Sequence, residues 1–287
     1  MSSSQSNNII AFMGVEGANA DLACRQAEPY METLAVPSFE DVFDAVATGK
    51  AKLGMIPIEN NQAGRVAEIH NILPRMDVHI VSEYMQPIEH CLMAVEGATI
   101  DSITDIYSHP QALLQSRDNL QDIGANAHPY SNTAQAAKDV AGWNDPTKAA
   151  LASPLAAELY GLTVLKPAMQ DSSDNITIFI VISGEPSAPD AKEKHVLTSI
   201  LFQARNIPGA LYKALGGFAT NGVNMIKLES YIPGGQGSST NAGSQFFLTF
   251  EGNPEDETTQ RALEELGFFS NKVKILGVYP ADERRYK

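Results

Sequence analysis

The stretch Ser183–His195, SGEPSAPDAKEKH, separates two parts of the sequence that follow different patterns. It is rich in proline, serine and charged residues, a composition typical of a linker. A chain of 287 residues is long enough for about two domains. We therefore predict a first domain over residues 8–184, a linker over residues 185–195 and a second domain over residues 196–280.

The part before the linker alternates short apolar runs with segments whose apolar residues recur at a period near 3.6. The runs predict strands, and they include IIAF (9–12), LGMIPI (53–58), CLMAV (91–95), KAALA (148–152) and ITIFIVI (176–182). The segments between them predict helices, for example FEDVFDAVATG (39–49) and NTAQAAKDVAG (132–142). This alternation indicates an α/β domain with a largely parallel sheet.

The part after the linker has a different order of elements. Strand-like VLTSILFQ (196–203) is followed by a helical segment (209–222), the strand NMIKLESYI (224–232) and a glycine and serine loop (233–244). The strand QFFLTFEG (245–252), a second helix (254–270) and the strand VKILGVYP (273–280) complete the chain. The order is βαββαβ, the ferredoxin-like arrangement.

Composition excludes several classes of function. The formal net charge of −14 disfavours nucleic acid and anionic membranes as partners, because both would be repelled. The hydrophobic fraction of 44% is that of an ordinary globular protein, with no run that could span a membrane. Two cysteines in a chain of this length do not form a disulfide framework, and no Cys/His spacing predicts a metal site. We expect a cytoplasmic protein.

Polar residues gather where predicted strands end and helices begin. Glu59 and Asn60 follow one strand, Ser108 ends another, and Thr133 opens a helix. In parallel α/β sheets these ends converge on the crevice that binds ligands, and helix starts offer N–H groups to an anion. The alternative is that such residues only cap helices. Thr177 also has two interpretations: it can be a functional residue, or it can be an ordinary strand residue, since β-branched residues are common in strands.

Seven motifs in order resemble one family. They are GMIPIENNQAGRV (54–66), SHPQALLQ (108–115), NTAQAA (132–137), LASPLAAELYGL (151–162), QDSSDNITIF (170–179), IPGALYKAL (207–215) and KLESY (227–231). Together they are similar to bacterial prephenate dehydratases that carry a C-terminal ACT regulatory domain. The resemblance covers nearly the whole chain.

The resemblance implies a two-lobed, periplasmic-binding-protein-like catalytic domain and a ferredoxin-like ACT domain. The implied reaction removes carbon dioxide and water from prephenate to give phenylpyruvate in phenylalanine biosynthesis, without cofactor or metal. It assigns the catalytic role to Thr177, with positioning residues Glu59, Asn60, Ser108, Gln111, Gln115 and Thr133. It also implies feedback by L-phenylalanine bound between paired ACT domains, hence a homodimer or homotetramer. The implied effector residues are Gly209, Ala210, Leu211, Asn224, Glu229 and Ser230.

Four positions depart from the family pattern. Ile178 stands where an arginine usually follows the threonine, and Ala20 and Asn61 each replace a usual serine. Tyr231 replaces an arginine of the effector motif. Loss of a charge-assisted hydrogen bond to a carboxylate costs about 1.5–3 kcal/mol. Either Arg65 and helix N-termini compensate, or the substrate is arogenate, or the chain is a non-catalytic ligand-binding regulatory protein.

Overall fold

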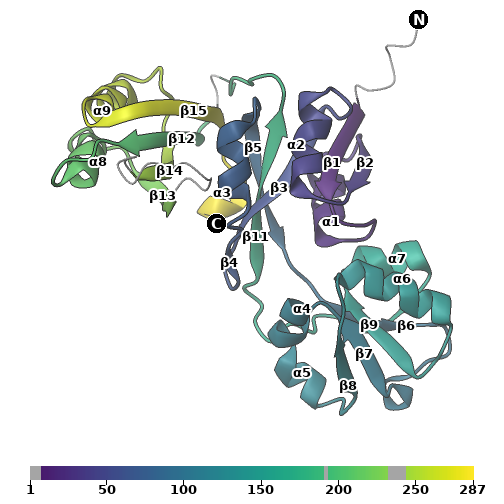
Figure 1. The fold of residues 1–287 in the computed structure, drawn as a ribbon. Helices are drawn as coiled ribbons and strands as arrows, with labels where there is room; N and C mark the ends of the chain where they lie inside the picture. The colour runs from purple at the N-terminus through teal and green to yellow at the C-terminus, as the bar shows by residue number, and fades with distance from the viewer. Residues whose placement is uncertain (1–7, 191–192, 232–243) are drawn as a thin grey trace, which may run out of the picture. The chain divides into compact units, whose positions relative to one another are not determined.

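The computed structural model describes residues 8–190, 193–231 and 244–287. The chain forms two compact units, each built from two stretches of sequence. Unit 1 contains the residues up to Arg65 and Met85–Phe179, and unit 2 contains Val66–Tyr84 and Ile180–Lys287. Figure 1 shows the elements of both. Most of the predicted glycine and serine loop, 233–244, lies outside the described residues.

The first sheet has the strand order β2-β1-β3-β11-β5, and the short strand β4 pairs with β3. Its strands are β1 (Ile9–Met13), β2 (Glu32–Val36), β3 (Leu53–Asn60), β4 (Gly64–Arg65), β5 (His79–Pro87) and β11 (Ile176–Ser183). Helices α1 (Asn19–Ala27) and α2 (Phe39–Ala47) pack on β1 and β3. Ser38 caps α2 by accepting a hydrogen bond from the backbone N–H of Asp41 at 3.1 Å.

The second sheet belongs to unit 1 and has the order β10-β6-β9-β7-β8. Its strands are β6 (Cys91–Ala94), β7 (Asp105–Ser108), β8 (Asn126–Pro129), β9 (Lys148–Ala152) and β10 (Thr163–Lys166). Its helices are α4 (Pro110–Gln115), α5 (Arg117–Gln121), α6 (Thr133–Trp143) and α7 (Pro154–Tyr160). β7 is parallel to β8 and β9, but β6 is antiparallel to β9 and β10. The prediction of a largely parallel sheet is therefore wrong for this half, in which two of the four strand pairings are antiparallel.

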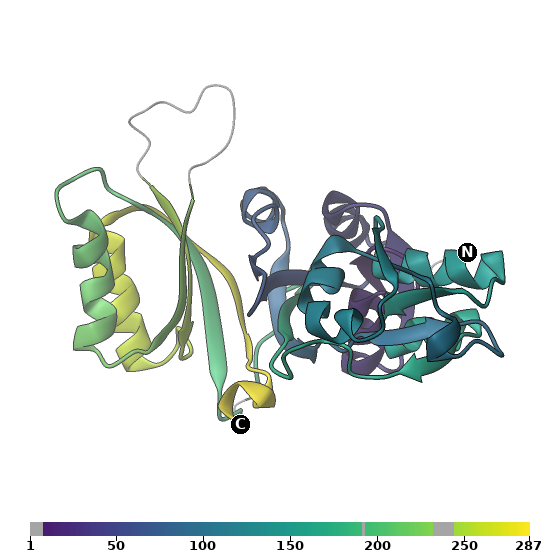
Figure 2. The same cartoon turned by 90° about the horizontal axis from the view of Figure 1, so that it is seen from below.

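Unit 2 contains the predicted βαββαβ order. The sheet runs β13-β14-β12-β15, from β12 (Val196–Ala204), β13 (Met225–Tyr231), β14 (Gln245–Glu251) and β15 (Ser270–Pro280). Helices α8 (Ala210–Thr220) and α9 (Glu257–Phe268) lie side by side on one face of this sheet, as Figure 2 shows. The core between them is apolar and includes Ile200, Phe202, Phe218 and Phe250.

The segment 66–84 lies in unit 2 because specific contacts bind it to the C-terminal part of the chain. It contains α3 (Ile69–Ile72), the 3₁₀ turn η2 (Leu73–Arg75) and most of β5. Glu83, on β5, is 7% exposed and accepts hydrogen bonds from Arg285 Nε at 2.8 Å and Nη2 at 2.6 Å. Gly277 packs so closely on β5 that an added Cβ would lie 2.0 Å from the carbonyl oxygen of Ile80.

This division into compact units differs from the domain boundaries predicted from the sequence, which stay a prediction. β12 does begin at Val196, where the second domain is expected to begin. Among the helices of the described residues, none is long and apolar enough to cross a membrane.

Candidate active site

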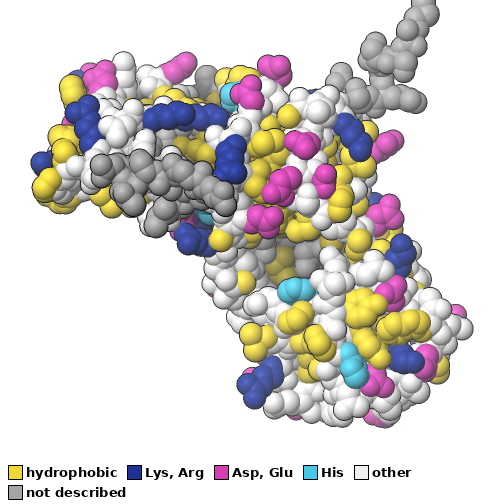
Figure 3. Space-filling model, in the orientation of Figure 1, with side chains coloured by type: hydrophobic (Ala, Val, Ile, Leu, Met, Phe, Trp, Pro, Cys, Tyr) yellow, Lys and Arg dark blue, Asp and Glu magenta, His cyan; other side chains and the backbone are white. Residues whose placement is uncertain are grey.

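Unit 1 contains a pocket with a cavity volume of about 430 Å³. The surface of this unit is visibly hollowed (Figure 3). The pocket is lined by amide, hydroxyl, imidazole and apolar side chains: Met13, Ala18, Asn19, Asn60, Ala63, Ile88, His90, His109, Gln111, Ala112, Gln115, Ser131, Asn132, Thr133 and Thr177. These residues come from β1, β3 and β11 of the first sheet, from α1, α4 and the start of α6, and from the loops next to them.

Thr177 and Asn60 form the central contact of the pocket. They lie on neighbouring strands, β11 and β3, and Asn60 Nδ2 donates to Thr177 Oγ1 at 3.0 Å. Asn60 is fixed in turn by its Oδ1, which accepts from the backbone N–H groups of Gln62 at 3.1 Å and Ala63 at 2.8 Å. Because the Thr177 oxygen accepts this bond, its own proton stays available, and it has no acceptor among the described residues.

A chain of side-chain hydrogen bonds extends from Asn60 across the pocket. Asn60 Nδ2 also donates to Asn175 Oδ1 at 2.8 Å, and Asn175 Nδ2 donates to Gln115 Oε1 at 3.1 Å. His90 Nε2 lies 3.3 Å from the same Gln115 oxygen. An amide oxygen only accepts, so His90 carries its proton on Nε2. The amide NH₂ of Gln115 is then left for a ligand.

His90 is 3% exposed, and burial lowers the pKa of its imidazole below 6.5, while the hydrogen bond with Gln115 opposes the shift. His90 is therefore neutral at pH 7. Its Nδ1 and the Oδ1 of Asn19 are buried acceptors with no hydrogen-bond donor among the described residues. Both residues line the pocket, which therefore has two acceptors that a ligand donor could satisfy.

Helix α6 begins at the pocket wall. Asn132 caps it, because its Oδ1 accepts from the backbone N–H groups of Ala134 at 2.8 Å and Gln135 at 3.2 Å. Thr133, the first residue of the helix, also lines the pocket. The positive end of the helix dipole thus faces the cavity, and it favours an anionic group there.

The pocket brings together Asn60, Gln111, Gln115, Thr133 and Thr177 of the residues predicted from the sequence. Ser108 is fully buried and donates to the backbone oxygen of Leu151 at 2.6 Å, so its hydroxyl supports β9 and not the pocket wall. Glu59 is on β3 opposite Arg65 of β4, and neither lines the pocket. The role of each predicted residue stays a prediction.

Sequence reasoning missed His90 and Asn175. No charged Lys, Arg, Asp or Glu side chain is among the residues that line the pocket. Ile178 adds no positive charge where the family pattern has arginine, and Ala20 and Asn61 lie outside the lining.

The predicted effector residues lie in unit 2 at two places. Gly209, Ala210 and Leu211 form the start of α8, where Gly209 has a φ of +69° that suits glycine. Glu229 and Ser230 lie on β13, an edge strand of the sheet. Asn224, just before β13, donates from Nδ2 to Glu251 Oε2 at 3.0 Å.

Comparison with known proteins identifies the family. The sequence model of the family described as "Prephenate dehydratase" matches residues 10–187. The chain belongs to the prephenate dehydratase family. The fold is the family's two-lobed, periplasmic-binding-protein-like architecture followed by an ACT domain.

Two relatives illustrate the range of names in this family. A protein from Komagataeibacter europaeus, named "Bifunctional N-acyl-homoserine lactone acylase/prephenate dehydratase", is 44% identical over 97% of this chain and 98% of its own. "Arogenate dehydratase/prephenate dehydratase 2, chloroplastic" from Arabidopsis thaliana is 34% identical over 95% of this chain and 73% of its own.

Two solved structures share the whole fold. One, described as "GqqA- a novel type of quorum quenching acylases", has a TM-score of 0.90 at 44% identity and covers 97% of this chain and 100% of its own. The other, prephenate dehydratase from Arthrobacter aurescens in complex with L-Phe, has a TM-score of 0.83 at 28% identity, with coverage of 95% and 89%.

Proposed function

We propose that this protein is a prephenate dehydratase that acts in the pocket of unit 1. The observation that carries the proposal is the Thr177 hydroxyl, held at 3.0 Å by an amide that can only donate to it. A hydroxyl in this state is a proton donor to whatever occupies the pocket. The proposed reaction needs one such donor, because hydroxide is a poor leaving group until it is protonated.

The proposed step balances without a cofactor. The ring carbon of prephenate that bears the carboxylate loses carbon dioxide, and the electrons of that bond enter the ring. The ring double bonds shift, and the bond from the opposite ring carbon to its hydroxyl oxygen breaks. The oxygen takes a proton from Thr177 and leaves as water, and solvent later returns the proton. Asn60 stabilises the negative charge that develops on the Thr177 oxygen.

The remaining pocket groups would hold the substrate in place. The free amide NH₂ of Gln115 and the N-terminus of α6 at Thr133 suit the carboxylates of prephenate. Apolar side chains such as Ile88 and Ala112 suit the ring. Because no lysine or arginine of the described residues lines the pocket, we expect binding to depend on these neutral donors, with a lower affinity than an arginine would give.

Arogenate is the alternative substrate, since it carries an ammonium where prephenate has a keto group. Two buried acceptors, Asn19 Oδ1 and His90 Nδ1, favour a ligand with N–H donors. The test presents both substrates at equal concentration and measures phenylpyruvate and phenylalanine by chromatography. Phenylpyruvate in excess supports prephenate, while phenylalanine in excess would reassign the substrate and leave the Thr177 mechanism intact.

A second candidate activity is hydrolysis of N-acyl-homoserine lactones, as in the name of the relative that is 44% identical. The neutral, partly apolar lining of the pocket favours it. An acyl transfer needs a nucleophile next to a base. The side chain that contacts Thr177 is the amide of Asn60, which is not a base, and this disfavours Thr177 as the nucleophile. Release of homoserine lactone that disappears in Thr177→Val would place this second activity in the same pocket. Release that persists would place it elsewhere.

We further propose that L-phenylalanine regulates the protein through unit 2, in a homodimer or homotetramer. The complex of the Arthrobacter aurescens enzyme with L-Phe supports binding of this effector in the family. The edge position of β13, which carries Glu229 and Ser230, suits pairing with a second copy. The coupling free energy expected for such feedback is about 1–3 kcal/mol.

Matched variants of Thr177 test the proposed mechanism. Thr177→Val keeps the shape and removes the hydroxyl, whereas Thr177→Ser keeps the hydroxyl. We expect Val to lower the kcat for phenylpyruvate formation about 10²–10³-fold and Ser to keep most of it. A smaller loss in Val than in Ser would instead assign Thr177 a packing role. No turnover in the folded wild type would favour a non-catalytic ligand-binding protein.

A further inference from the structure

The sheet of unit 2 has a second face, which α8 and α9 do not cover. Strand register places two rows of side chains across this face. In one row Leu201 of β12 lies between Lys274 of β15 and Phe247 of β14. In the next row Gln203 lies between Lys272 and Gln245. Successive rows on one face are two residues apart, so both lysines leave β15 on the same side.

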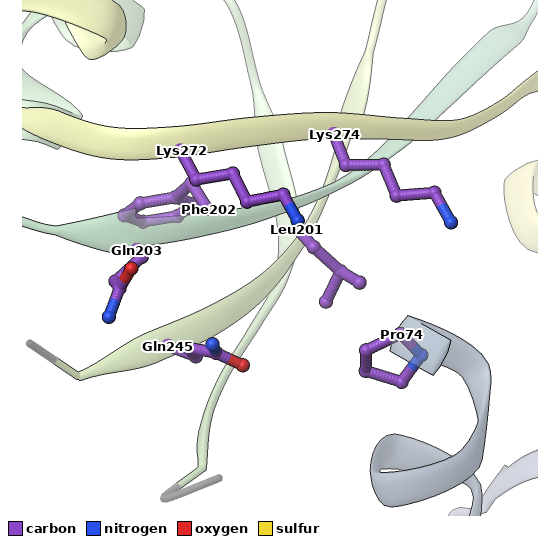
Figure 4. A pocket seen from close by; sticks show the side chains of 7 residues that line it. All are labelled: Pro74, Leu201, Phe202, Gln203, Gln245, Lys272 and Lys274. Atoms are coloured by element: carbon purple, nitrogen blue, oxygen red, sulfur yellow. The ribbon is translucent and has the colours of Figure 1, made fainter. Parts of the chain in front are cut away.

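The two rows are covered differently. Segment 66–76 lies over the Leu201 row, where the His70 ring packs edge-on against Phe247 at a centroid distance of 5.4 Å. Lys274 Nζ donates to the backbone oxygen of Met76 at 3.2 Å. The cover ends at Pro74, and no other part of the described chain covers the Gln203 row beyond it. The result is a pocket between Pro74 and the sheet, drawn in Figure 4.

The pocket combines an apolar wall with cationic and amide groups. Leu201, 9% exposed, and Pro74 form the apolar part. Lys272 and Lys274 extend from β15 beside the amides of Gln203 and Gln245 (Figure 4). Among the described residues, no acidic side chain lines the pocket, and neither lysine forms an ion pair.

Two lysines that are two residues apart on one face of a strand repel each other, and the formal charge of the whole chain is −14. An uncompensated cationic pair is thus a local exception in an acidic protein. A bound anion relieves the repulsion, and amide N–H groups add hydrogen bonds to its oxygens. The apolar wall beside the pair favours an anion that also carries an apolar group.

We propose that this pocket binds a small carboxylate that carries an apolar group. Its carboxylate lies between Lys272 and Lys274, within reach of the amide of Gln245, and its apolar group lies on Leu201 and Pro74. An amino acid fits poorly, because its ammonium meets two lysines and no acidic group. The site is therefore distinct from the proposed phenylalanine site at α8 and β13, and the proposal is independent of the dehydratase activity.

Calorimetric titration of the full chain with 3-phenylpropionate tests the proposal. We expect one site per chain, with an affinity that falls at least tenfold in Lys272→Gln/Lys274→Gln and returns in Lys272→Arg/Lys274→Arg. The matched control is Lys138→Gln/Lys194→Gln, which makes the same charge change at two exposed lysines outside the pocket and should bind as wild type. Lys272→Gln alone serves as a second variant, because it keeps the contact of Lys274 with Met76.

Two further probes separate the contribution of the carboxylate charge to binding from that of the apolar group. 3-Phenylpropionamide has the apolar group without the charge, and inorganic phosphate has charge without the apolar group. Both should bind at least tenfold more weakly than 3-phenylpropionate. The proposal is overturned if 3-phenylpropionate does not bind at 10 mM, if it binds the lysine-to-glutamine variants as well as wild type, or if either probe binds equally well.

Discussion

Replacing Asn60 by aspartate should disable Thr177 without changing it. The substitution preserves shape and keeps an oxygen for the backbone N–H groups of Gln62 and Ala63. It removes the NH₂ that donates to Thr177 Oγ1 at 3.0 Å. The new carboxylate would instead accept the Thr177 proton. The hydroxyl would then point away from the substrate, although it is still present.

The size of the effect follows from the number of donors lost. Removing one preorganised donor from a site of developing charge lowers kcat about 10²–10³-fold, or about 2.7–4 kcal/mol. Asn60→Asp and Thr177→Val should each cost this much, because each removes the same proton from the same place. Their double variant should cost no more than one of them, so the coupling energy should be about 2.7–4 kcal/mol.

The assay is steady-state formation of phenylpyruvate from prephenate by the wild type, both single variants and the double variant. Asn61→Asp is the matched control. It adds the same charge one residue away, and its side chain contacts the Asp174 oxygen at 3.0 Å and the Ile176 N–H at 2.9 Å, but not Thr177. It should lower kcat less than about threefold. Circular dichroism and melting temperature confirm that each variant is folded.

Multiplicative losses would refute this reasoning. If the double variant lost about 10⁴-fold or more, the two residues would act independently, and Asn60 would not work through Thr177. A loss in Asn61→Asp as large as in Asn60→Asp would equally show that charge, and not the orientation of Thr177, is responsible.

Three further predictions concern stability. Burial keeps His90 neutral in the folded protein, so below pH 6.5 the unfolded chain takes up a proton that the folded chain does not, and the free energy of unfolding falls. The urea midpoint of the wild type should therefore drop more between pH 7.5 and 5.5 than that of His90→Gln, and equal drops would contradict the shift. Glu83→Gln leaves the Arg285 guanidinium without its buried partner and should cost about 3 kcal/mol by urea unfolding, whereas a cost under about 1 kcal/mol would mean that water replaces the pair. Gly277→Ala inserts a Cβ against a backbone carbonyl of β5 and should cost at least about 3 kcal/mol. Gly267→Ala, in open space on α9, should be neutral or stabilising, and similar melting temperatures for the two glycine variants would contradict the contact.

Local patterns were sufficient to predict much of the fold. The order βαββαβ of unit 2 follows from alternating apolar residues and turn signals within short windows, and β12 to β15 lie where that pattern places them. The association of segment 66–84 with this unit could not be predicted. It depends on contacts such as Glu83 with Arg285, which are 202 residues apart and have no local signature.

The site shows the same limit. Asn60 could be proposed from a strand end and Thr177 from the family resemblance, but the hydrogen bond between them joins residues 117 positions apart, and the bond between Asn175 and Gln115 joins residues 60 positions apart. His90 has no capping or motif context, so only the folded structure reveals that it is buried beside Gln115. Ser108 shows the opposite error, because local reasoning predicted a site residue that does not line the pocket. Its hydroxyl instead donates a hydrogen bond to the backbone carbonyl of Leu151.

The most direct test of the central claim is the rate at which the purified wild-type protein forms phenylpyruvate from prephenate, followed by absorbance with and without 1 mM phenylalanine. We predict turnover well above the spontaneous rate and a lower rate with phenylalanine. If phenylpyruvate forms no faster with the folded protein than in buffer alone, the assignment of dehydratase activity to the pocket of unit 1 is contradicted.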